Sequence, residues 1–191
     1  MLYRILVPIV KLGIKVFYSE INIRNRFRLP EKGPLLVIAN HPNTLLDAWL
    51  IGYMFNKPIY YLAKATFFKN PVVRLILYSL NMIPINRKGD VDIKGITNED
   101  SFEACYRTLE KGRILVVFPE GNSFQERKIR ELKSGSARIL LGAEARNNFE
   151  LGTKFISIGL NYSAAHLFRS KILINVREVY DAIDYKDKYL K

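Results

Sequence analysis

The first of the two histidines in the chain, His41, has a carboxylate six positions further on, at Asp47. A carboxylate on one ring nitrogen of a histidine fixes its tautomer, so that the other nitrogen can take a proton from a hydroxyl group. Pro42 favours an extended backbone at His41, and Asn43 is a good N-cap for a following helix. The pair is a candidate general-base dyad, and a loop histidine beside an ordinary helix carboxylate is the alternative.

Basic residues follow a short apolar run that begins at Met82 and leads into Asn86-Arg87-Lys88-Gly89. The planar guanidinium of Arg87 matches a phosphate group, and Lys88 beside it adds a second positive charge. The segment is a candidate phosphate site with Asn86 as a further polar contact, and a solvated turn is the alternative.

A single carboxylate ends the strongest apolar run, in Phe118-Pro119-Glu120-Gly121-Asn122-Ser123. The proline and glycine around Glu120 predict a tight turn that aims the carboxylate at one place and leaves the Gly121 amide accessible. Ser123 resembles the serine of a nucleophile elbow, but the second glycine of that motif is missing, so we do not expect a hydrolase.

Four cations follow this turn, at Arg127, Lys128, Arg130 and Lys133, and lead to Ser134-Gly135-Ser136 at the start of a helix. Basic side chains before a helix N-terminus are suited to bind an anion. An exposed charged loop is the alternative interpretation.

Strands and helices alternate along the chain and place these motifs at strand ends. Apolar runs predict strands at Leu35–Ala39, Ile59–Ala63, Ile114–Phe118, Phe155–Leu160 and Ile172–Val176, with a half-exposed strand around Ile21 and Ile23. Helical patterns cover Thr44–Phe55, Pro71–Leu80, Asn98–Lys111 and Ser136–Arg146. The charged stretch Arg177–Lys191 is expected to be either a surface helix or the start of a truncated segment. The alternation predicts an α/β fold with a mixed, partly parallel central sheet flanked by helices. Ligands of such sheets bind just beyond the strand ends.

Composition narrows the function classes. The chain has 191 residues, which is typical of one domain, and 49% of them are hydrophobic, which excludes intrinsic disorder. The formal charge of +12 favours nucleic acid, anionic lipid or a phosphorylated substrate as partner. A single cysteine, Cys105, excludes an intramolecular disulfide and fits a reducing compartment. No zinc-ligand spacing or nucleotide-binding glycine motif is present. The longest uncharged stretches, Gly33–Leu46 and Phe155–Phe168, do not reach the ~18 apolar residues of a spanning helix.

Residues 1–20 are predicted to form an amphipathic helix separate from the main domain at 21–191. Its cations Arg4, Lys11 and Lys15 fall within ~40° of one another on a helical wheel, beside Pro8, which should kink the helix. A narrow cationic stripe on a broad apolar helix is typical of a segment that lies in a membrane interface. A terminal helix that covers the core is the alternative.

The order of the three motifs resembles the glycerolipid acyltransferase family, which includes glycerol-3-phosphate, dihydroxyacetone-phosphate and lysophosphatidate acyltransferases. The resemblance runs from about Pro34 to Val176. It includes Lys133-Ser134-Gly135-Ser136-Ala137-Arg138 after the Phe-Pro-Glu-Gly block, and Gly159-Leu160-Asn161-Tyr162 as a fourth block.

The resemblance implies a role for each motif. His41 would be the general base, oriented by Asp47, and would deprotonate a glycerol hydroxyl that attacks the thioester of acyl-CoA or acyl carrier protein. Arg87 would bind the acceptor's phosphate, while Glu120 and Gly121 would position the glycerol backbone. Asn86, Ser123 and Lys133 are further expected substrate contacts, and Lys88, Arg127, Lys128 and Arg130 are expected contacts of the acyl donor or a phosphate. The resemblance implies no metal and no bound cofactor.

The chain departs from the common family pattern at two places. Five residues separate His41 from Asp47 where four are usual, so the connecting turn must differ if the dyad is to form. Ser123 stands where many members carry arginine. Both features resemble the glycerol-3-phosphate and dihydroxyacetone-phosphate branch, which favours a small phosphorylated acceptor over lysophosphatidate. The resemblance and the N-terminal helix together predict a peripheral or monotopic enzyme on the cytoplasmic face of a membrane.

Two other function classes stay open. Arg24, Arg26 and Arg28 alongside Phe27 would suit a nucleic-acid-binding module, although most aromatic residues fall at core positions and we expect no nucleic-acid partner. An inactive lipid-binding relative would keep the same architecture.

The helix Pro71–Leu80 with Phe67 and Phe68 would either shape an acyl-chain groove or pack the core.

Overall fold

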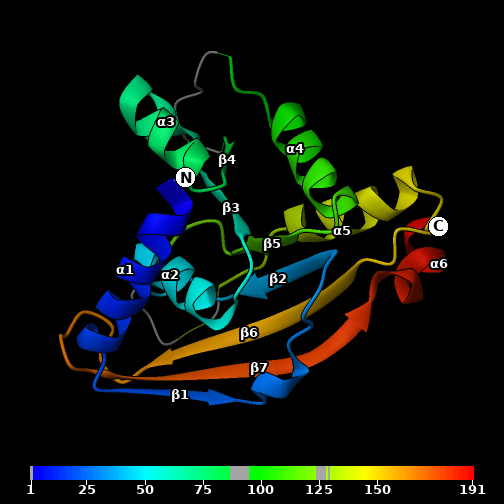
Figure 1. Ribbon diagram of the computed structural model, residues 1–191. Helices are drawn as coiled ribbons and strands as arrows, with labels where there is room; N and C mark the ends of the chain where they lie inside the picture. The colour runs from blue at the N-terminus through cyan, green and yellow to red at the C-terminus, as the bar shows by residue number, and fades with distance from the viewer. Residues whose placement is uncertain (1, 87–94, 124–127, 129) are drawn as a thin grey trace.

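The computed structural model describes residues 2–86, 95–123, 128 and 130–191. These residues form a seven-stranded sheet in the order β1-β7-β6-β2-β5-β3-β4 (Figure 1). The strands from β6 to β4 run parallel, whereas β7 is antiparallel to β6 and parallel to β1. The predicted fold class, a mixed and partly parallel sheet flanked by helices, is confirmed.

The strands are β1 (Glu20–Arg24), β2 (Leu35–Ala39), β3 (Ile59–Lys64), β4 (Met82–Ile85), β5 (Ile114–Val117), β6 (Lys154–Tyr162) and β7 (Lys171–Asp181). The α-helices are α1 (Leu2–Phe17), α2 (Thr44–Met54), α3 (Pro71–Ser79), α4 (Asn98–Glu110), α5 (Gly135–Arg146) and α6 (Lys186–Tyr189). Short 3-10 helices cover Arg26–Arg28, Ala65–Phe68 and Ala182–Tyr185. The predicted strands and helices before residue 177 all form, most of them with ends within two residues of the prediction.

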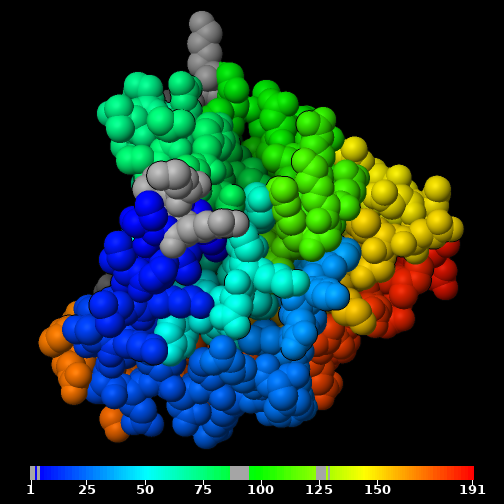
Figure 2. Space-filling model, viewed as in Figure 1, coloured from blue at the N-terminus to red at the C-terminus, as the bar shows by residue number. Residues whose placement is uncertain are grey.

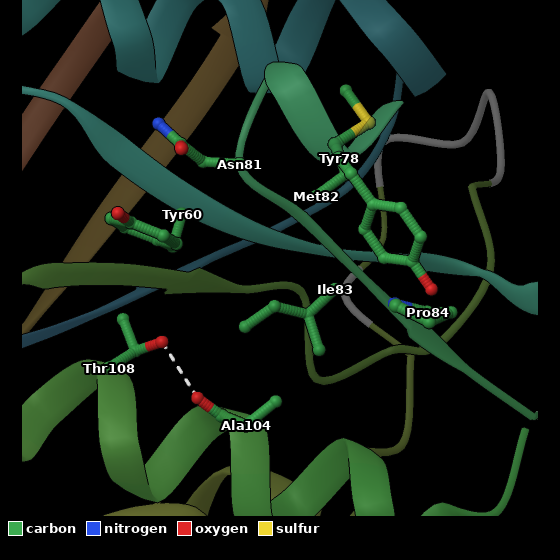
Figure 3. Close-up of a pocket in the computed structure, with 8 residues that line it drawn as sticks. All are labelled: Tyr60, Tyr78, Asn81, Met82, Ile83, Pro84, Ala104 and Thr108. Carbon is green, nitrogen blue, oxygen red and sulfur yellow. Dashed lines mark hydrogen bonds between the residues drawn. The ribbon is translucent and has the colours of Figure 1, made fainter. Parts of the chain in front are cut away.

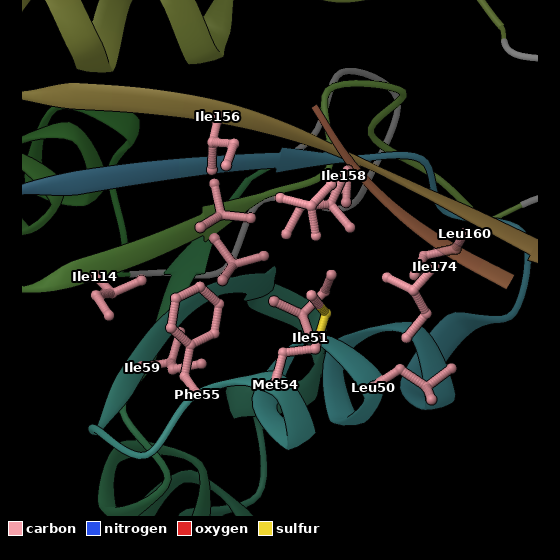
Figure 4. Packing of buried hydrophobic residues seen from close by; sticks show 14 of the residues in the cluster. Leu50, Ile51, Met54, Phe55, Ile59, Ile114, Ile156, Ile158, Leu160 and Ile174 are labelled. Atoms are coloured by element: carbon pink, nitrogen blue, oxygen red, sulfur yellow. The ribbon is translucent and has the colours of Figure 1, made fainter. Parts of the chain in front are cut away.

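Neighbouring residues of a strand point to opposite sides of a sheet. In the central strands both sides are covered by helices, so these strands are buried on both faces. Leu35 and Val37 of β2 pack with α1 and α2, and Leu36 between them packs with α4 and α5. Figure 4 shows part of the first cluster, in which side chains of α2 meet those of β6. One pair of helices therefore covers each face, and the carboxyl ends of the parallel strands share one edge of the sheet.

The segment after Arg177 first continues β7 to Asp181 as the antiparallel partner of β6, and the expected surface helix forms only beyond it, as α6, which has no buried residue. Lys154 and Asp181 form an ion pair at 3.1 Å across the two strands, and Phe155 stacks on Tyr180 with ring centroids 5.4 Å apart. These cross-strand pairs keep the charged, tyrosine-rich sequence in a strand.

Helix α1 contacts the core with one face and solvent with another. Ile14 is buried in the core cluster of α2, and Val10 packs against the same cluster. The opposite face carries a row of large apolar side chains, each more than half exposed: Ile5, Ile9, Leu12 and Val16. The helix therefore does cover the core, and the exposed row keeps the interfacial function a prediction. In Figure 2, α1 (dark blue) lies on the same visible surface as α3.

The cations of the predicted stripe on α1 differ in their surroundings. Lys11 donates a hydrogen bond from Nζ to the backbone oxygen of Phe55, just after α2, at 3.0 Å. Lys15 is exposed, and the side chain of Arg4 lies outside the described part of the structure. Within the described ranges, no helix is long and apolar enough to pass through a membrane.

Candidate active site

His41 and Asp47 form the predicted dyad. Nδ1 of His41 lies 2.9 Å from Oδ2 of Asp47, whose side chain is 0% exposed. The imidazole stacks on the ring of Phe118, with centroids 4.1 Å apart and planes 15° from parallel. A neutral imidazole that donates from Nδ1 to the carboxylate carries its lone pair on Nε2. The geometry therefore prepares Nε2 to accept a proton.

The turn between the two residues accommodates the extra position. Thr44, the first residue of α2, adopts a left-handed backbone with φ 46°, which is uncommon for a β-branched side chain. The backbone N–H of Asn43 donates to Oδ2 of Asp47 at 2.7 Å, so the turn folds back over the carboxylate. The longer connection thus still allows Asp47 to reach His41.

Ser123 lies against this turn. Its Oγ accepts a hydrogen bond from the backbone N–H of Thr44 at 2.8 Å and lies 3.1 Å from Thr44 Oγ1. Ser123 thus satisfies an N–H at the start of α2, which is the role of an N-cap, although it comes from another element. The expected N-cap, Asn43, makes no cap bond, and its side-chain amide donates to the backbone oxygen of Ala165 instead.

Two polar side chains fix the chain at Asn40 and His41. Asn40 pairs with Leu160 of β6 in both directions, at 2.9 Å from Nδ2 and 2.7 Å to Oδ1. Glu120, which is 8% exposed, accepts the backbone N–H of His41 at 3.0 Å through Oε1 and that of Arg130 at 3.4 Å through Oε2. The carboxylate predicted to position the substrate therefore also holds the backbone of His41.

Lys133 returns to the turn that Glu120 opens. Its backbone N–H donates to the oxygen of Pro119 at 2.9 Å, and its side chain lies over Gly121. A Cβ on Gly121, whose φ is 77°, would come within 2.6 Å of Nζ of Lys133. The left-handed backbone favours glycine at this position, whereas the end of the flexible Lys133 side chain can move aside. The structure therefore brings Lys133 and Gly121 together beside the dyad.

The structure describes only some of the remaining predicted site residues. Lys128 and Arg130 are exposed, whereas Arg87, Lys88 and Arg127 lie outside the described residues. Asn86 donates from Nδ2 to the oxygen of Ile96 at 2.6 Å, and its backbone N–H donates to Asn98 at 3.1 Å. Asn86 therefore fastens the end of β4 to the start of α4.

Tyr162 is a site residue that the sequence analysis missed. It ends β6, and its hydroxyl donates to Oδ1 of Asp47 at 2.5 Å. Burial and the negative charge of Asp47 raise the pKa of Tyr162 well above its ordinary value. The only sequence signal was its place at a strand end, in the fourth motif of the family, because 115 positions separate it from Asp47.

An apolar hollow of about 250 Å³ lies elsewhere in the fold (Figure 3). Tyr60, Met82, Ile83, Pro84, Ala104 and Thr108 line it together with Tyr78 of α3 and Asn81. It shares no residue with the dyad. Helix α3 contributes no buried residue, so it borders this hollow rather than packing into the core, although Phe68 just before it is buried and Phe67 is exposed.

Cys105 is buried in α4, and burial raises the pKa of its thiol to about 12, so it behaves as a core residue. Among the described residues, no group of three or more histidine, cysteine, aspartate and glutamate side chains is placed to hold a metal ion.

Comparison with known proteins identifies the family. The model of the Acyltransferase family matches residues 20–160, so the chain belongs to this family, and the family resemblance is confirmed. A 1-acyl-sn-glycerol-3-phosphate acyltransferase of Borreliella burgdorferi is 23% identical over 167 residues, which are 87% of this chain and 60% of that protein. An uncharacterized acyltransferase of Schizosaccharomyces pombe is 20% identical over 250 residues, covering 87% of this chain and 37% of that protein.

The fold has a solved counterpart. The crystal structure of the 1-acyl-sn-glycerophosphate (LPA) acyltransferase PlsC from Thermotoga maritima superposes with a TM-score of 0.68 at 18% identity, over 99% of this chain and 78% of that one. This likeness concerns the fold. The chain spans 60% and 37% of the lengths of its two curated relatives.

Proposed function

We propose that this protein is an O-acyltransferase of phospholipid biosynthesis that transfers a fatty acyl group from a thioester to the free hydroxyl of 1-acylglycerol 3-phosphate. The observation that carries the proposal is the His41–Asp47 dyad at 2.9 Å, stacked on Phe118, in a chain of the Acyltransferase family.

The dyad supplies the proton transfers of this reaction. Nε2 of His41 takes the proton of the acceptor hydroxyl as its oxygen attacks the thioester carbonyl, and Asp47 stabilises the imidazolium that forms. The tetrahedral intermediate then collapses, the carbon–sulfur bond breaks, and the proton passes from His41 to the departing thiolate. An ester and a free thiol result without a covalent enzyme intermediate.

Two observations bear on the choice of acceptor, and they point to different molecules. The five-residue spacing and Ser123 favour glycerol 3-phosphate or dihydroxyacetone phosphate. The better matching curated relative, however, is named a 1-acyl-sn-glycerol-3-phosphate acyltransferase, and the solved counterpart is an LPA acyltransferase. The shared acceptor in the names of these two proteins is stronger support than the spacing of one turn and Ser123. We therefore propose lysophosphatidate as the acceptor.

The acceptor's phosphate needs cations near the dyad. Lys133, whose side chain lies over Gly121, is one described side chain that we propose for this role. Arg130 is exposed on the same loop, where its backbone bonds to Glu120. The phosphate is also predicted to contact Arg87. The acyl donor, which is acyl-CoA or acyl carrier protein, or a phosphate is predicted to contact Lys88 and Arg127.

A lipid acceptor requires contact with a membrane surface. The exposed apolar row of α1 (Ile5, Ile9, Leu12 and Val16) and the cation of Lys15 beside it suit an anionic interface. We propose that the protein attaches peripherally through this face of α1, on the cytoplasmic side, where its thioester donors are found.

A direct assay tests the proposed function. Purified protein is mixed with a long-chain acyl donor and, separately, with lysophosphatidate, glycerol 3-phosphate or dihydroxyacetone phosphate; released thiol and lipid product are measured. We expect phosphatidate from lysophosphatidate, and loss of transfer in His41→Ala but not in His166→Ala. Product only from a water-soluble acceptor would change the acceptor, and full activity of His41→Ala would reject the mechanism.

A further inference from the structure

We propose that Tyr162 is a positioning residue of this active site: its hydroxyl holds the Asp47 carboxylate in the orientation that keeps Nε2 of His41 unprotonated. This inference rests on the proposed function for its catalytic meaning, and on geometry alone for the link between the three residues.

The carboxylate of Asp47 receives hydrogen bonds on both oxygens. Oδ2 accepts from the backbone N–H of Asn43 at 2.7 Å and lies 2.9 Å from Nδ1 of His41. Oδ1 accepts from the Tyr162 hydroxyl at 2.5 Å. A buried carboxylate with bonds on one oxygen alone could rotate about its terminal torsion, which is broad and roughly two-fold. Tyr162 removes that freedom because it engages the oxygen that faces away from His41.

The hydroxyl can act only as a donor in this pair. Burial and the charge of Asp47 raise the pKa of Tyr162, so the phenol stays protonated wherever the carboxylate is ionised. The bond spreads part of the carboxylate's charge toward β6 and leaves Oδ2 for His41.

Tyr162 itself is held in place by its surroundings. Tyr18, which follows α1, is 2% exposed and packs against it with ring centroids 6.0 Å apart. The backbone at Tyr162 pairs with Ile172 of β7. A rigid strand end and a buried aromatic neighbour thus fix the phenol, as a positioning group requires.

The test compares two tyrosine-to-phenylalanine changes that each remove one hydroxyl bond to α2. Tyr162→Phe removes the bond to Asp47. The matched control, Tyr61→Phe, removes a 2.9 Å bond to the backbone oxygen of Ala48, the residue after Asp47. Both are made in a His166→Gln background, which leaves His41 as the single histidine. Nitrogen-15 NMR at pH 8.5 then reports the tautomer of His41, and steady-state kinetics reports kcat and KM.

We expect the wild-type ring to be almost entirely protonated at Nδ1, and Tyr162→Phe to raise the Nε2-protonated fraction several-fold. We also expect kcat to fall ~10-fold, the effect of losing one hydrogen bond to a charged group, with KM for both substrates within two-fold. Tyr61→Phe should change neither the tautomer nor kcat, whatever it does to the melting temperature.

Each outcome decides something. An unchanged tautomer and an unchanged kcat in Tyr162→Phe, or equal losses in both variants, would overturn the positioning role. If the unmodified protein transfers no acyl group but Tyr162→Phe still shifts the tautomer, the proposed function fails while the link from Tyr162 to His41 stands.

Discussion

The carboxylate of Glu120 accepts the backbone N–H of His41 at 3.0 Å, which joins the ends of β5 and β2 across 79 positions of sequence. The Phe-Pro-Glu-Gly turn therefore contributes two residues to the surroundings of His41. Phe118 supplies the surface on which the imidazole stacks, and Glu120 fixes the backbone that carries it. The His41 motif and the Phe-Pro-Glu-Gly motif are therefore joined by direct contacts.

Glu120→Ala should impair folding as well as catalysis. The change leaves the N–H groups of His41 and Arg130 without their acceptor, and a lost buried partner costs ~1–3 kcal/mol. Glu120→Gln keeps one acceptor oxygen and should retain more of both. Chemical denaturation and kcat measure the two effects; a rise in acceptor KM alone, with unchanged stability, would show that Glu120 contacts substrate instead.

Asp47→Asn should lower kcat on the order of 10³-fold with little change in KM. The amide cannot stabilise the imidazolium and does not favour the tautomer with a free Nε2. The control is Asp187→Asn, an exposed carboxylate of α6. Circular dichroism should show an intact fold, and near-normal turnover would mean that the dyad does not carry the proton.

Ser123→Ala should loosen the turn that accommodates the longer spacing. The N–H of Thr44 loses its acceptor, so we expect ~1 kcal/mol of destabilisation, as for a lost helix cap, and a several-fold lower kcat. Ser79→Ala, which removes a hydroxyl–backbone bond within α3, is the control and should leave kcat unchanged. An effect of Ser123→Ala confined to acceptor KM would instead support the substrate contact predicted from the sequence.

The double change Ile9→Glu and Leu12→Glu should abolish attachment to vesicles. Both side chains are exposed, at 60% and 64%, so the fold should tolerate the carboxylates, which an anionic surface repels. Flotation with vesicles of phosphatidylglycerol and phosphatidylcholine measures binding. Leu190→Glu, an equally exposed apolar position near the C-terminus, should bind like the unmodified protein; equal loss in both would point to a general charge effect.

The sequence predicts most of the fold because short apolar runs and turn residues are local signals. The buried strands Leu35–Ala39 and Ile114–Val117 are apolar throughout, and the dyad lies within one connection. The spacing argument also singles out the turn before Asp47, where Thr44 has a left-handed backbone. What local patterns miss is the end of β7, whose charged residues are held in a strand by pairing with β6.

The partners of the dyad depend on topology. Tyr162 meets Asp47, and Glu120 meets the His41 backbone, only because β6 and β5 flank β2 in parallel register. Thr44 takes a conformation that its residue type disfavours, because Asp47 and Ser123 hold the turn from both sides. Apart from the bond between Asn43 and Asp47, these contacts have no signature within a few residues.

Helix α1 has a geometric consequence for substrate delivery. It is fastened to α2 through Lys11, and Tyr18 just beyond its end packs on Tyr162, one hydrogen bond from Asp47. A helix of 16 residues, ~24 Å long, whose exposed face is the proposed lipid contact, is thus linked through these contacts to the His41–Asp47 pair. On the proposed surface, this fixes the depth at which His41 stands relative to the headgroups. The protein would then choose its acceptor hydroxyl partly by height above the bilayer.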